Sequence, residues 1–259
     1  MLKKILLVAN ASEYGIVKFL EFAVTEIEDR EDVLDAGAGL CTYRKLFAHA
    51  NYQSCDMGGK HDFLCSLEAI PVADASYDTI INTQVLEHVE SPEAVLREFY
   101  RILRHGGKLF LTAPQGWGEH GDNYFNFVSQ GLRLLFERVG FQVMCVIPLG
   151  GIFWLTGKRY RDFPWYVYRQ YVFRGNKFHP SVGSFVLAPF FILALPFCRY
   201  IIPWLCFWLD RLDRDKKWTL NYGCYGVKLR TNGIQRGKVA KGYPKASQPN
   251  PVPSKGIVV

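Results

Sequence analysis

The residues best suited to chemistry lie in segment 33–39, where a short apolar stretch leads into an aspartate and two closely spaced glycines. Asp35 stands directly before Gly37 and Gly39, and Asp56 follows the next apolar stretch, residues 52–55. Glycines at the carboxyl end of a strand let the backbone approach a ligand closely. An acidic side chain about twenty residues later can accept hydrogen bonds from ribose hydroxyls. This spacing predicts a site for a nucleoside-containing cofactor.

The neighbouring positions narrow the kind of cofactor. A dinucleotide fingerprint needs a third glycine or an alanine three places after Gly39, so that a helix can present its N-terminus to a pyrophosphate. That place is occupied by Thr42. The carboxylate of Asp35 can instead face a cationic amino group, which favours a cofactor with an amino group over a dinucleotide.

Four segments in this order resemble class I S-adenosylmethionine-dependent methyltransferases. Asp35 and the glycine turn are similar to motif I of that family. The resemblance continues through the entry to the fourth strand (LEAIP and DASYDTII, residues 67–71 and 74–81), its exit (NTQVLEHV, 82–89) and the turn into the fifth strand (RILRHGGKL, 101–109). It covers residues 33–143 and implies an α/β fold, a doubly wound, seven-stranded Rossmann-like sheet, with S-adenosylmethionine as cofactor.

The same resemblance assigns roles to individual residues. It implies that the methionine part of the cofactor is held by Asp35, Gly37 and Gly39, the ribose by Asp56, and the adenine by Ser66 with the backbone of Leu67, while Gln84 leaves the fourth strand on the ligand side. Many relatives have an aspartate where Ser66 stands, and a hydroxyl is a different acceptor for the adenine amino group. The adenine site therefore departs from the family pattern. The seven cysteines form no ligand-like cluster with histidine, so no metal site is expected.

The segment after the fifth strand, residues 114–127, is similar to an acceptor-lining loop of relatives associated with polysaccharides and lipids. It keeps His120 but has Asn123 and Asn126 where those relatives have aspartate and arginine. A hydroxyl acceptor must lose a proton, and histidine is the side chain best matched to that task near neutral pH. His120 is the first candidate for the general base and His88 the second, and each can equally be structural.

Charge and composition divide the chain into four expected parts. Residues 1–150 form the cofactor-binding core, and they carry 13 basic against 20 acidic residues, so no nucleic-acid footprint is expected there. Residues 151–217 form a hydrophobic insertion. Residues 218–230 hold the last strand, expected at 222–229 and antiparallel to the sixth. Residues 231–259, rich in Gly, Pro, Lys and Ser, are expected to be a disordered basic tail.

The insertion has the composition of a membrane-associated segment. It holds eighteen aromatic residues, eleven basic and four acidic ones, and residues 182–198 carry no charge. Pro189, Pro196 and Pro203 interrupt it, and a single crossing would separate the last strand from its sheet. Short helices in the membrane interface, or a re-entrant hairpin turning near Pro196, are the favoured interpretation. A packed soluble cap or dimer face, and a spanning helix, are the alternatives.

These features predict a methyltransferase that modifies a glycan or lipid-linked saccharide at the cytoplasmic face of the membrane, as a peripheral or monotopic protein. One alternative is methylation of a quinone or similar lipid. Another is a non-catalytic protein of the same fold that scaffolds a membrane assembly. The acceptor is thus expected to be a small molecule or a lipid-linked one, and the oligomeric state is left open.

Overall fold

The structure is a computed structural model that describes residues 10–118, 122–174, 177–178, 189 and 192–229. The chain divides into two compact units. One comprises Ile16–Leu149 and the chain from Asn221 onward, and the other comprises Met1–Gly15 and Gly150–Leu220. We call the first the sheet unit and the second the helical unit.

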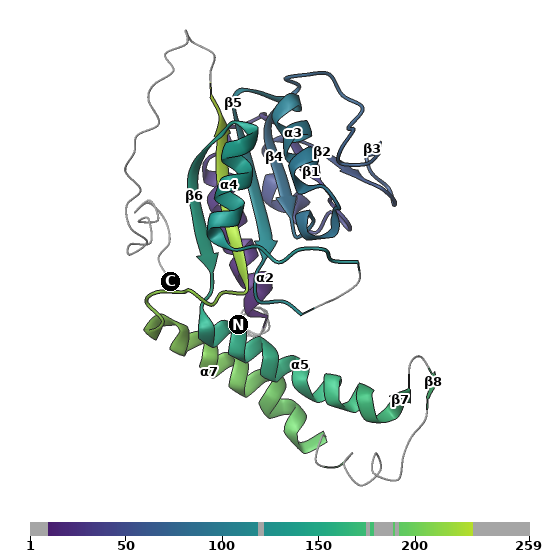
Figure 1. Ribbon diagram of the computed structural model, residues 1–259, viewed down its shortest axis with the longest axis vertical. Helices are drawn as coiled ribbons and strands as arrows, with labels where there is room; N and C mark the ends of the chain where they lie inside the picture. The colour runs from purple at the N-terminus through teal and green to yellow at the C-terminus, as the bar shows by residue number, and fades with distance from the viewer. Residues whose placement is uncertain (1–9, 119–121, 175–176, 179–188, 190–191, 230–259) are drawn as a thin grey trace. The chain divides into compact units, whose positions relative to one another are not determined.

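The sheet unit is built on seven strands in the order β3-β2-β1-β4-β5-β9-β6 (Figure 1). The pairs β3-β2, β2-β1, β1-β4 and β4-β5 are parallel, whereas β9 runs antiparallel to both of its neighbours. This confirms the predicted Rossmann-like fold with a last strand that follows a long insertion. The strands are β1 (Asp32–Ala36), β2 (Asn51–Asp56), β3 (Phe63–Leu64), β4 (Tyr77–Thr83), β5 (Leu103–Pro114), β6 (Phe141–Leu149) and β9 (Asn221–Lys228).

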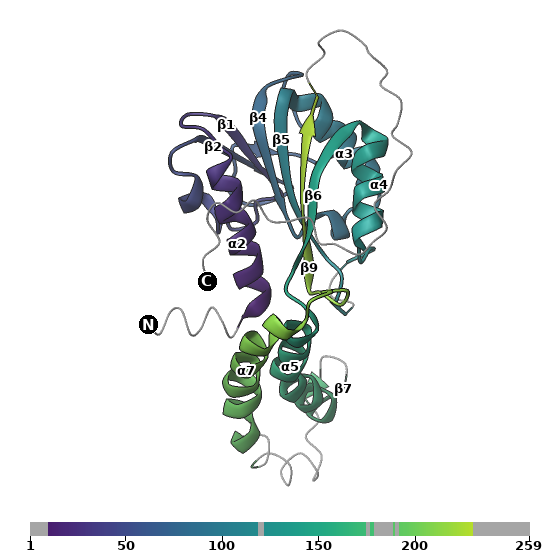
Figure 2. The same cartoon turned by 90° about the vertical axis from the view of Figure 1, so that its left-hand side faces the viewer.

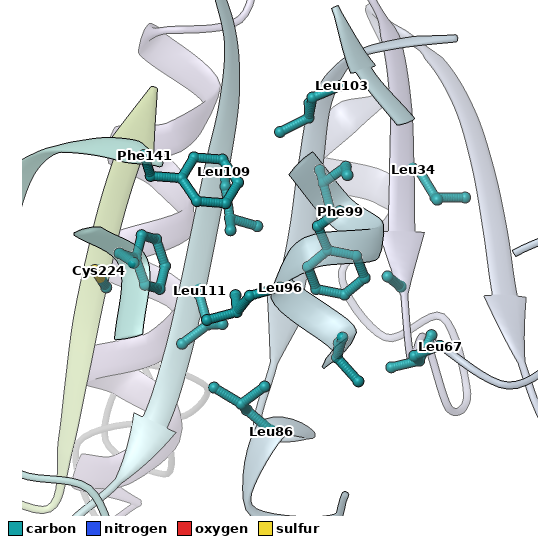
Figure 3. Close-up of a cluster of buried hydrophobic side chains, with 14 of the residues drawn as sticks. Leu34, Leu67, Leu86, Leu96, Phe99, Leu103, Leu109, Leu111, Phe141 and Cys224 are labelled. Carbon is teal, nitrogen blue, oxygen red and sulfur yellow. The ribbon is translucent and has the colours of Figure 1, made fainter. Parts of the chain in front are cut away.

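Helices cover both faces of this sheet, with α2 (Ala11–Thr25) on one side and α3 (Pro92–Ile102) and α4 (Ser129–Val139) on the other (Figure 2). Alternate residues of each strand point to opposite faces. Leu34 therefore joins the cluster beneath α3 and α4, together with Phe99 (Figure 3), while its neighbour Val33 joins Phe19 beneath α2. Asp35 and Asn82 lie toward the carboxyl ends of β1 and β4 and are buried there.

The sequence predicts a helix over residues 42–50 and a helix that begins after Ser91 and ends at Gly106, and the structure shows that the first prediction and the predicted end of the second helix are wrong. The stretch after the glycine turn forms only a short 3-10 helix, η1 (Arg44–Phe47), rather than a helix over residues 42–50. Helix α3 ends at Ile102 and not at Gly106, which lies inside β5. The backbone turns extended at Leu103 because neighbouring groups take over the final carbonyls: the Lys228 ammonium donates to the Tyr100 and Leu103 oxygens, at 2.7 Å each.

The helical unit contains two long helices that lie side by side. Helix α5 (Ile152–Val172) is followed by the short strands β7 (Phe173–Arg174) and β8 (Lys177–Phe178). A second continuous helix spans Ile192–Leu212 and includes a π-helical turn, η3 (Phe197–Ile201), then α7 (Ile202–Leu209) and the 3-10 turn η4 (Asp210–Leu212). We call it the second helix. The two helices are antiparallel, because Trp154 stacks on Phe207 at 5.2 Å and Gly157 lies against Cys206.

The prolines of the insertion do not break it as predicted. Pro164 lies inside α5, and the second helix runs through Pro196 and Pro203 without a turn of the chain. The π-helical turn lies between these two prolines, and such wider turns relieve the clash of a proline ring with the preceding carbonyls. The predicted short helices and the predicted hairpin turn near Pro196 are therefore wrong.

A buried aspartate fixes the start of α5. Asp210, 4 % exposed, accepts hydrogen bonds from the Gly151 N–H at 3.0 Å and the Trp154 N–H at 3.2 Å. The Lys216 ammonium pairs with the same carboxylate at 2.5 Å. A carboxylate at a helix N-terminus satisfies orphan N–H groups and the helix dipole together. Asp210, in the last turn of the second helix, thus also binds the N-terminus of α5.

Candidate functional site

The carboxyl end of β1 turns at two glycines, as the sequence predicted. Gly37 and Gly39 have φ values of +76° and +54°, which side chains with a Cβ adopt only at a cost. A Cβ on Gly37 would come within 2.6 Å of the Val85 side chain, so this turn packs closely on the segment after β4. Apart from its two chain neighbours, no described residue comes within 4 Å of the Cβ position of Gly39. The backbone at Gly39 is therefore accessible to a ligand.

The carboxylate of Asp35 is buried directly before this turn, with 1 % of the residue exposed. The Tyr52 hydroxyl, on β2, donates to Asp35 Oδ2 at 2.5 Å, whereas Asp35 Oδ1 has no hydrogen-bond partner in the part of the chain that the structure describes. Burial raises the pKa of Asp35 to about 6, and the Tyr52 hydrogen bond and the nearby His61 oppose that rise. A buried carboxylate with one unused oxygen is costly unless a charged donor completes it.

Asp56 connects the end of β2 to the glycine turn. Its Oδ2 accepts the Gly39 N–H at 2.9 Å, and its Oδ1 accepts the Met57 N–H at 2.7 Å. A carboxylate offers about four lone-pair positions, so each oxygen can still accept a hydroxyl. The structure thus brings together Asp35, the two glycines and Asp56 at the carboxyl ends of neighbouring strands, which is where open α/β sheets bind ligands.

The two residues predicted to hold adenine lie in the turn after β3. Ser66 is exposed, and its hydroxyl accepts the Glu68 N–H at 3.3 Å within the same turn. The Leu67 side chain is 7 % exposed and belongs to the core beneath α3. A role for the Ser66 hydroxyl and the Leu67 backbone toward adenine stays a prediction.

Gln84 begins the segment after β4 in a left-handed conformation, with φ at +56°. Its side-chain amide donates to the Thr112 hydroxyl of β5 at 3.1 Å, and its backbone N–H donates to the Thr112 carbonyl at 3.0 Å. The amide is therefore engaged by β5. The predicted role of Gln84 in binding the cofactor stays a prediction.

Glu87 is a buried acid that the sequence interpretation did not single out. It lies in the 3-10 helix η2 (Leu86–His88), it is 1 % exposed, and its Oε2 has no hydrogen-bond partner among the described residues. Burial raises the pKa of Glu87 to about 7. Its backbone carbonyl accepts the Tyr124 N–H at 2.7 Å, so Glu87 joins the segment after β4 to the loop predicted to line the acceptor. In the sequence, Glu87 follows Leu86 directly and lies two residues before Val89. This apolar surrounding was the signal that could have indicated a buried acid.

The structure describes one of the two candidate general bases, His88, and His120 lies outside the described residues. His88 lies beside Glu87, with 3.9 Å between His88 Nε2 and Glu87 Oε1, and its side chain is 37 % exposed. The structure thus places His88 at the carboxyl end of β4, in the segment that packs on the glycine turn. The role of His120 stays a prediction.

The unsatisfied buried atoms test whether the residues fit the expected cofactor. Within the described part of the chain, the buried side-chain atoms without a partner are Asp35 Oδ1, Asn82 Oδ1 and Glu87 Oε2. All three belong to β1, β4 or the turn after β4. Acceptors without donors at this edge of the sheet suit a ligand that brings hydrogen-bond donors and positive charge, as the ammonium of S-adenosylmethionine does. The residues present therefore fit this group.

A family model described as a methyltransferase domain matches residues 34–111. This part of the chain is therefore similar to a methyltransferase domain. The match begins just before Asp35 and ends in β5, so it covers the glycine turn, Asp56 and the segment after β4. The family and the fold together indicate S-adenosylmethionine as the cofactor of the methyltransferase domain.

Solved structures with the same fold support the architecture. A predicted methyltransferase from Bacillus halodurans has a TM-score of 0.51 at 13 % identity and covers 83 % of this chain and 98 % of its own. The [4+2]-cyclase SpnF has a TM-score of 0.50 at 12 % identity, with 81 % of this chain and 80 % of its own covered. At these identities the likeness shows the fold alone. Because one of these proteins is a cyclase, the fold does not by itself define the reaction.

Curated relatives are similar over the cofactor-binding part. An arsenite methyltransferase of Aquipseudomonas alcaligenes is 30 % identical over 82 residues, which is 32 % of this chain and 22 % of that protein. A ubiquinone biosynthesis O-methyltransferase of Parvibaculum lavamentivorans is 35 % identical over 64 residues, 24 % of this chain and 25 % of its own. The chain thus spans about a quarter of the length of these relatives.

The described residues also bear on membrane and metal binding. One helix, Ile192–Leu212, is long and apolar enough to cross a membrane by length and composition, with a mean hydropathy of 1.7, and only 11 % of it is buried. No group of three or more His, Cys, Asp or Glu side chains in the described ranges is arranged to hold a metal ion.

Proposed function

We propose that the chain is an S-adenosylmethionine-dependent methyltransferase that modifies a glycan or lipid-linked saccharide at the cytoplasmic face of a membrane. The observation that carries the methyl-transfer part is the Asp35 carboxylate. It is buried, one of its oxygens has no partner, and it stands before a glycine turn whose second glycine faces open space. This arrangement is suited to a cationic amino-acid moiety at the edge of the sheet.

The chain's own residues bind and orient the donor. The cofactor, when bound, supplies a methyl group on a sulfonium centre. Asp35 accepts from its amino group, the backbone at Gly37 and Gly39 lets the donor approach closely, and Asp56 accepts from its ribose hydroxyls. Holding donor and acceptor in line is the main contribution a protein makes to such a displacement.

On the acceptor side, His120 is proposed as the base that takes a proton from an acceptor hydroxyl, and His88 is the second candidate. The backbone of Glu87 holds Tyr124 and Phe125 through their N–H groups, at 2.7 and 3.3 Å. Glu87 thereby positions the loop on which the acceptor is proposed to lie. Its half-protonated side chain near pH 7 can also accept a hydrogen bond from an acceptor hydroxyl.

The saccharide acceptor is supported by the likeness of the 114–127 loop to loops of polysaccharide-associated relatives, and the membrane location by the exposed apolar side chains of the helical unit. The alternative acceptor is a quinone or similar lipid. It is supported by the similarity to a ubiquinone biosynthesis O-methyltransferase. A membrane location suits both acceptors.

Incubation of the full-length chain with methyl-labelled S-adenosylmethionine and a membrane extract tests the proposal. Label in a lipid-linked saccharide that is released by mild acid hydrolysis supports it, and label in the neutral quinone fraction supports the alternative acceptor. Labelling of neither fraction, together with no binding of the cofactor in calorimetry, would leave the non-catalytic scaffold as the remaining explanation.

A further inference from the structure

One face of the second helix carries exposed apolar side chains along its whole length. Phe197, Ile201, Leu205, Trp208 and Leu212 recur every three or four residues, so they lie on one face of the helix. Their exposed fractions run from 43 % to 69 %. We call these five residues the outward face. Trp204, beside them, is 44 % exposed.

The opposite face of the same helix packs within the unit. Gly157 of α5 lies so close that a Cβ there would meet Cys206 at 2.9 Å and the Pro203 backbone at 3.2 Å. Trp154 stacks on Phe207 with ring centroids 5.2 Å apart. The outward face is therefore not the face that α5 covers. The two helices run side by side in both views (Figures 1 and 2).

We propose that the outward face is a docking surface for an anionic lipid bilayer. Tryptophan and tyrosine side chains favour the headgroup level of a membrane, and arginines favour anionic lipids there. Arg211 lies over the Trp208 ring at 4.7 Å and Arg199 over the Tyr200 ring at 6.0 Å. Guanidinium groups are thus held beside the aromatic rings of this helix.

Charge favours lipid over a second copy of the chain as the occupant. The insertion has eleven basic and four acidic residues. Three of the acids are already paired within the unit: Asp162 with Lys158 at 2.7 Å, Asp210 with Lys216, and Asp215 with Lys217. The insertion therefore carries a net positive charge. Two copies of it repel each other, whereas anionic headgroups complement it.

The packing of α5 indicates that the second helix lies along the bilayer surface and does not cross it. A crossing would carry the adjoining α5 into the hydrocarbon layer, together with Lys158, Arg161 and Asp162, and charges at that depth are strongly disfavoured. Both ends of the helical unit also continue into β6 and β9, where Leu149 and Asn221 are paired. The chain therefore passes into the two helices and out of them on the same side of the membrane.

Vesicle flotation with the full-length chain tests this surface. The vesicles contain phosphatidylcholine alone or with phosphatidylglycerol. The test variant is Ile201→Gln with Leu205→Gln, on the outward face at 43 % and 47 % exposure. The matched control is Leu134→Gln with Met144→Gln, both 48 % exposed in the sheet unit. Thermal unfolding checks that both variants are folded.

The expected result is binding that requires phosphatidylglycerol and weakens with salt. The test variant should lose at least about tenfold in partitioning, because two large apolar side chains no longer gain from burial, and the control should bind as the wild type does. The proposal is overturned if the wild type does not float with the vesicles at low salt, or if the test variant floats unchanged. It is also overturned if the wild type is a dimer in light scattering and the test variant is a monomer.

This docking does not require methyl transfer. Flotation without any binding of S-adenosylmethionine would refute the proposed function and leave the docking surface standing. Binding of the cofactor without flotation would overturn the docking surface and leave the methyl-transfer part of the proposed function standing.

Discussion

Replacement of Tyr52 by phenylalanine tests how the site keeps Asp35 charged. The Tyr52 hydroxyl donates to Asp35 Oδ2 at 2.5 Å. Burial raises the pKa of Asp35 to about 6, and this hydrogen bond limits the rise. The groups that face this pair are His61, which lowers the pKa of Asp35, Asp56, which raises it, and Cys41, which faces Tyr52.

The expected magnitude follows from the hydrogen bond. A bond to a charged acceptor contributes about 1.5–3 kcal/mol, and a tenfold change in an equilibrium corresponds to about 1.4 kcal/mol. Loss of the Tyr52 hydroxyl therefore moves the protonation midpoint of Asp35 upward by about one to two pH units. Because the cationic donor binds the charged carboxylate, its affinity falls as the pH drops through that midpoint. At pH 7 the variant should bind S-adenosylmethionine about two- to tenfold more weakly.

Isothermal titration calorimetry from pH 5 to pH 9 measures this effect. The wild type should bind about tenfold more weakly at pH 5 than at pH 7, since its midpoint is near 6. The Tyr52→Phe variant should show the same fall at higher pH and recover wild-type affinity near pH 9. The control is Tyr77→Phe, which removes a β4 hydroxyl that donates to Gln53 of β2 at 2.8 Å. An unshifted profile for Tyr52→Phe would refute the role given to this hydrogen bond.

Three further variants test other parts of the molecule. Gly37→Ala should destabilise the chain by about 1–3 kcal/mol in denaturant unfolding, because the new Cβ meets Val85 at 2.6 Å in a left-handed conformation, and it should lose more stability than Gly39→Ala, which meets no atom. His120→Ala should keep the affinity for S-adenosylmethionine and lose turnover; full turnover would remove His120 as the base. Asp210→Ala should cost about 3–5 kcal/mol, because it leaves buried N–H groups and the Lys216 ammonium unpaired, whereas the exposed Asp215→Ala should change stability little; equal effects of the two would contradict the role of Asp210 in beginning α5.

Much of the sheet could be predicted because its signals are local. The apolar strand before Asp35, the glycines after it and the acid at position 56 are close in sequence. Each of these residue types is one that the carboxyl end of a strand uses to bind a ligand. The last strand was also predictable, because residues 222–229 are largely apolar and carry a single charge, that of Lys228, although they follow a long insertion.

The parts that were missed depend on contacts between distant segments. Tyr52 meets Asp35 only because β1 and β2 pair in the register Val33 with Tyr52 and Asp35 with Ser54, which the sequence does not state. The end of α3 at Ile102 depends on Lys228, which lies 125 residues after Leu103. The prediction that prolines interrupt the insertion was likewise wrong for the second helix, because a π-helical turn accommodates Pro203.

The most direct test of the account is calorimetric titration of S-adenosylmethionine into the wild type and the Asp35→Asn variant. Asparagine keeps the shape of the side chain and an oxygen for the Tyr52 hydroxyl, but it removes the charge. The account predicts binding to the wild type and a loss of about a hundredfold or more in the variant, with little dependence on pH between 5 and 7, because a buried charge loses its partner. Equal affinity for both proteins, or no heat with the wild type, would contradict it.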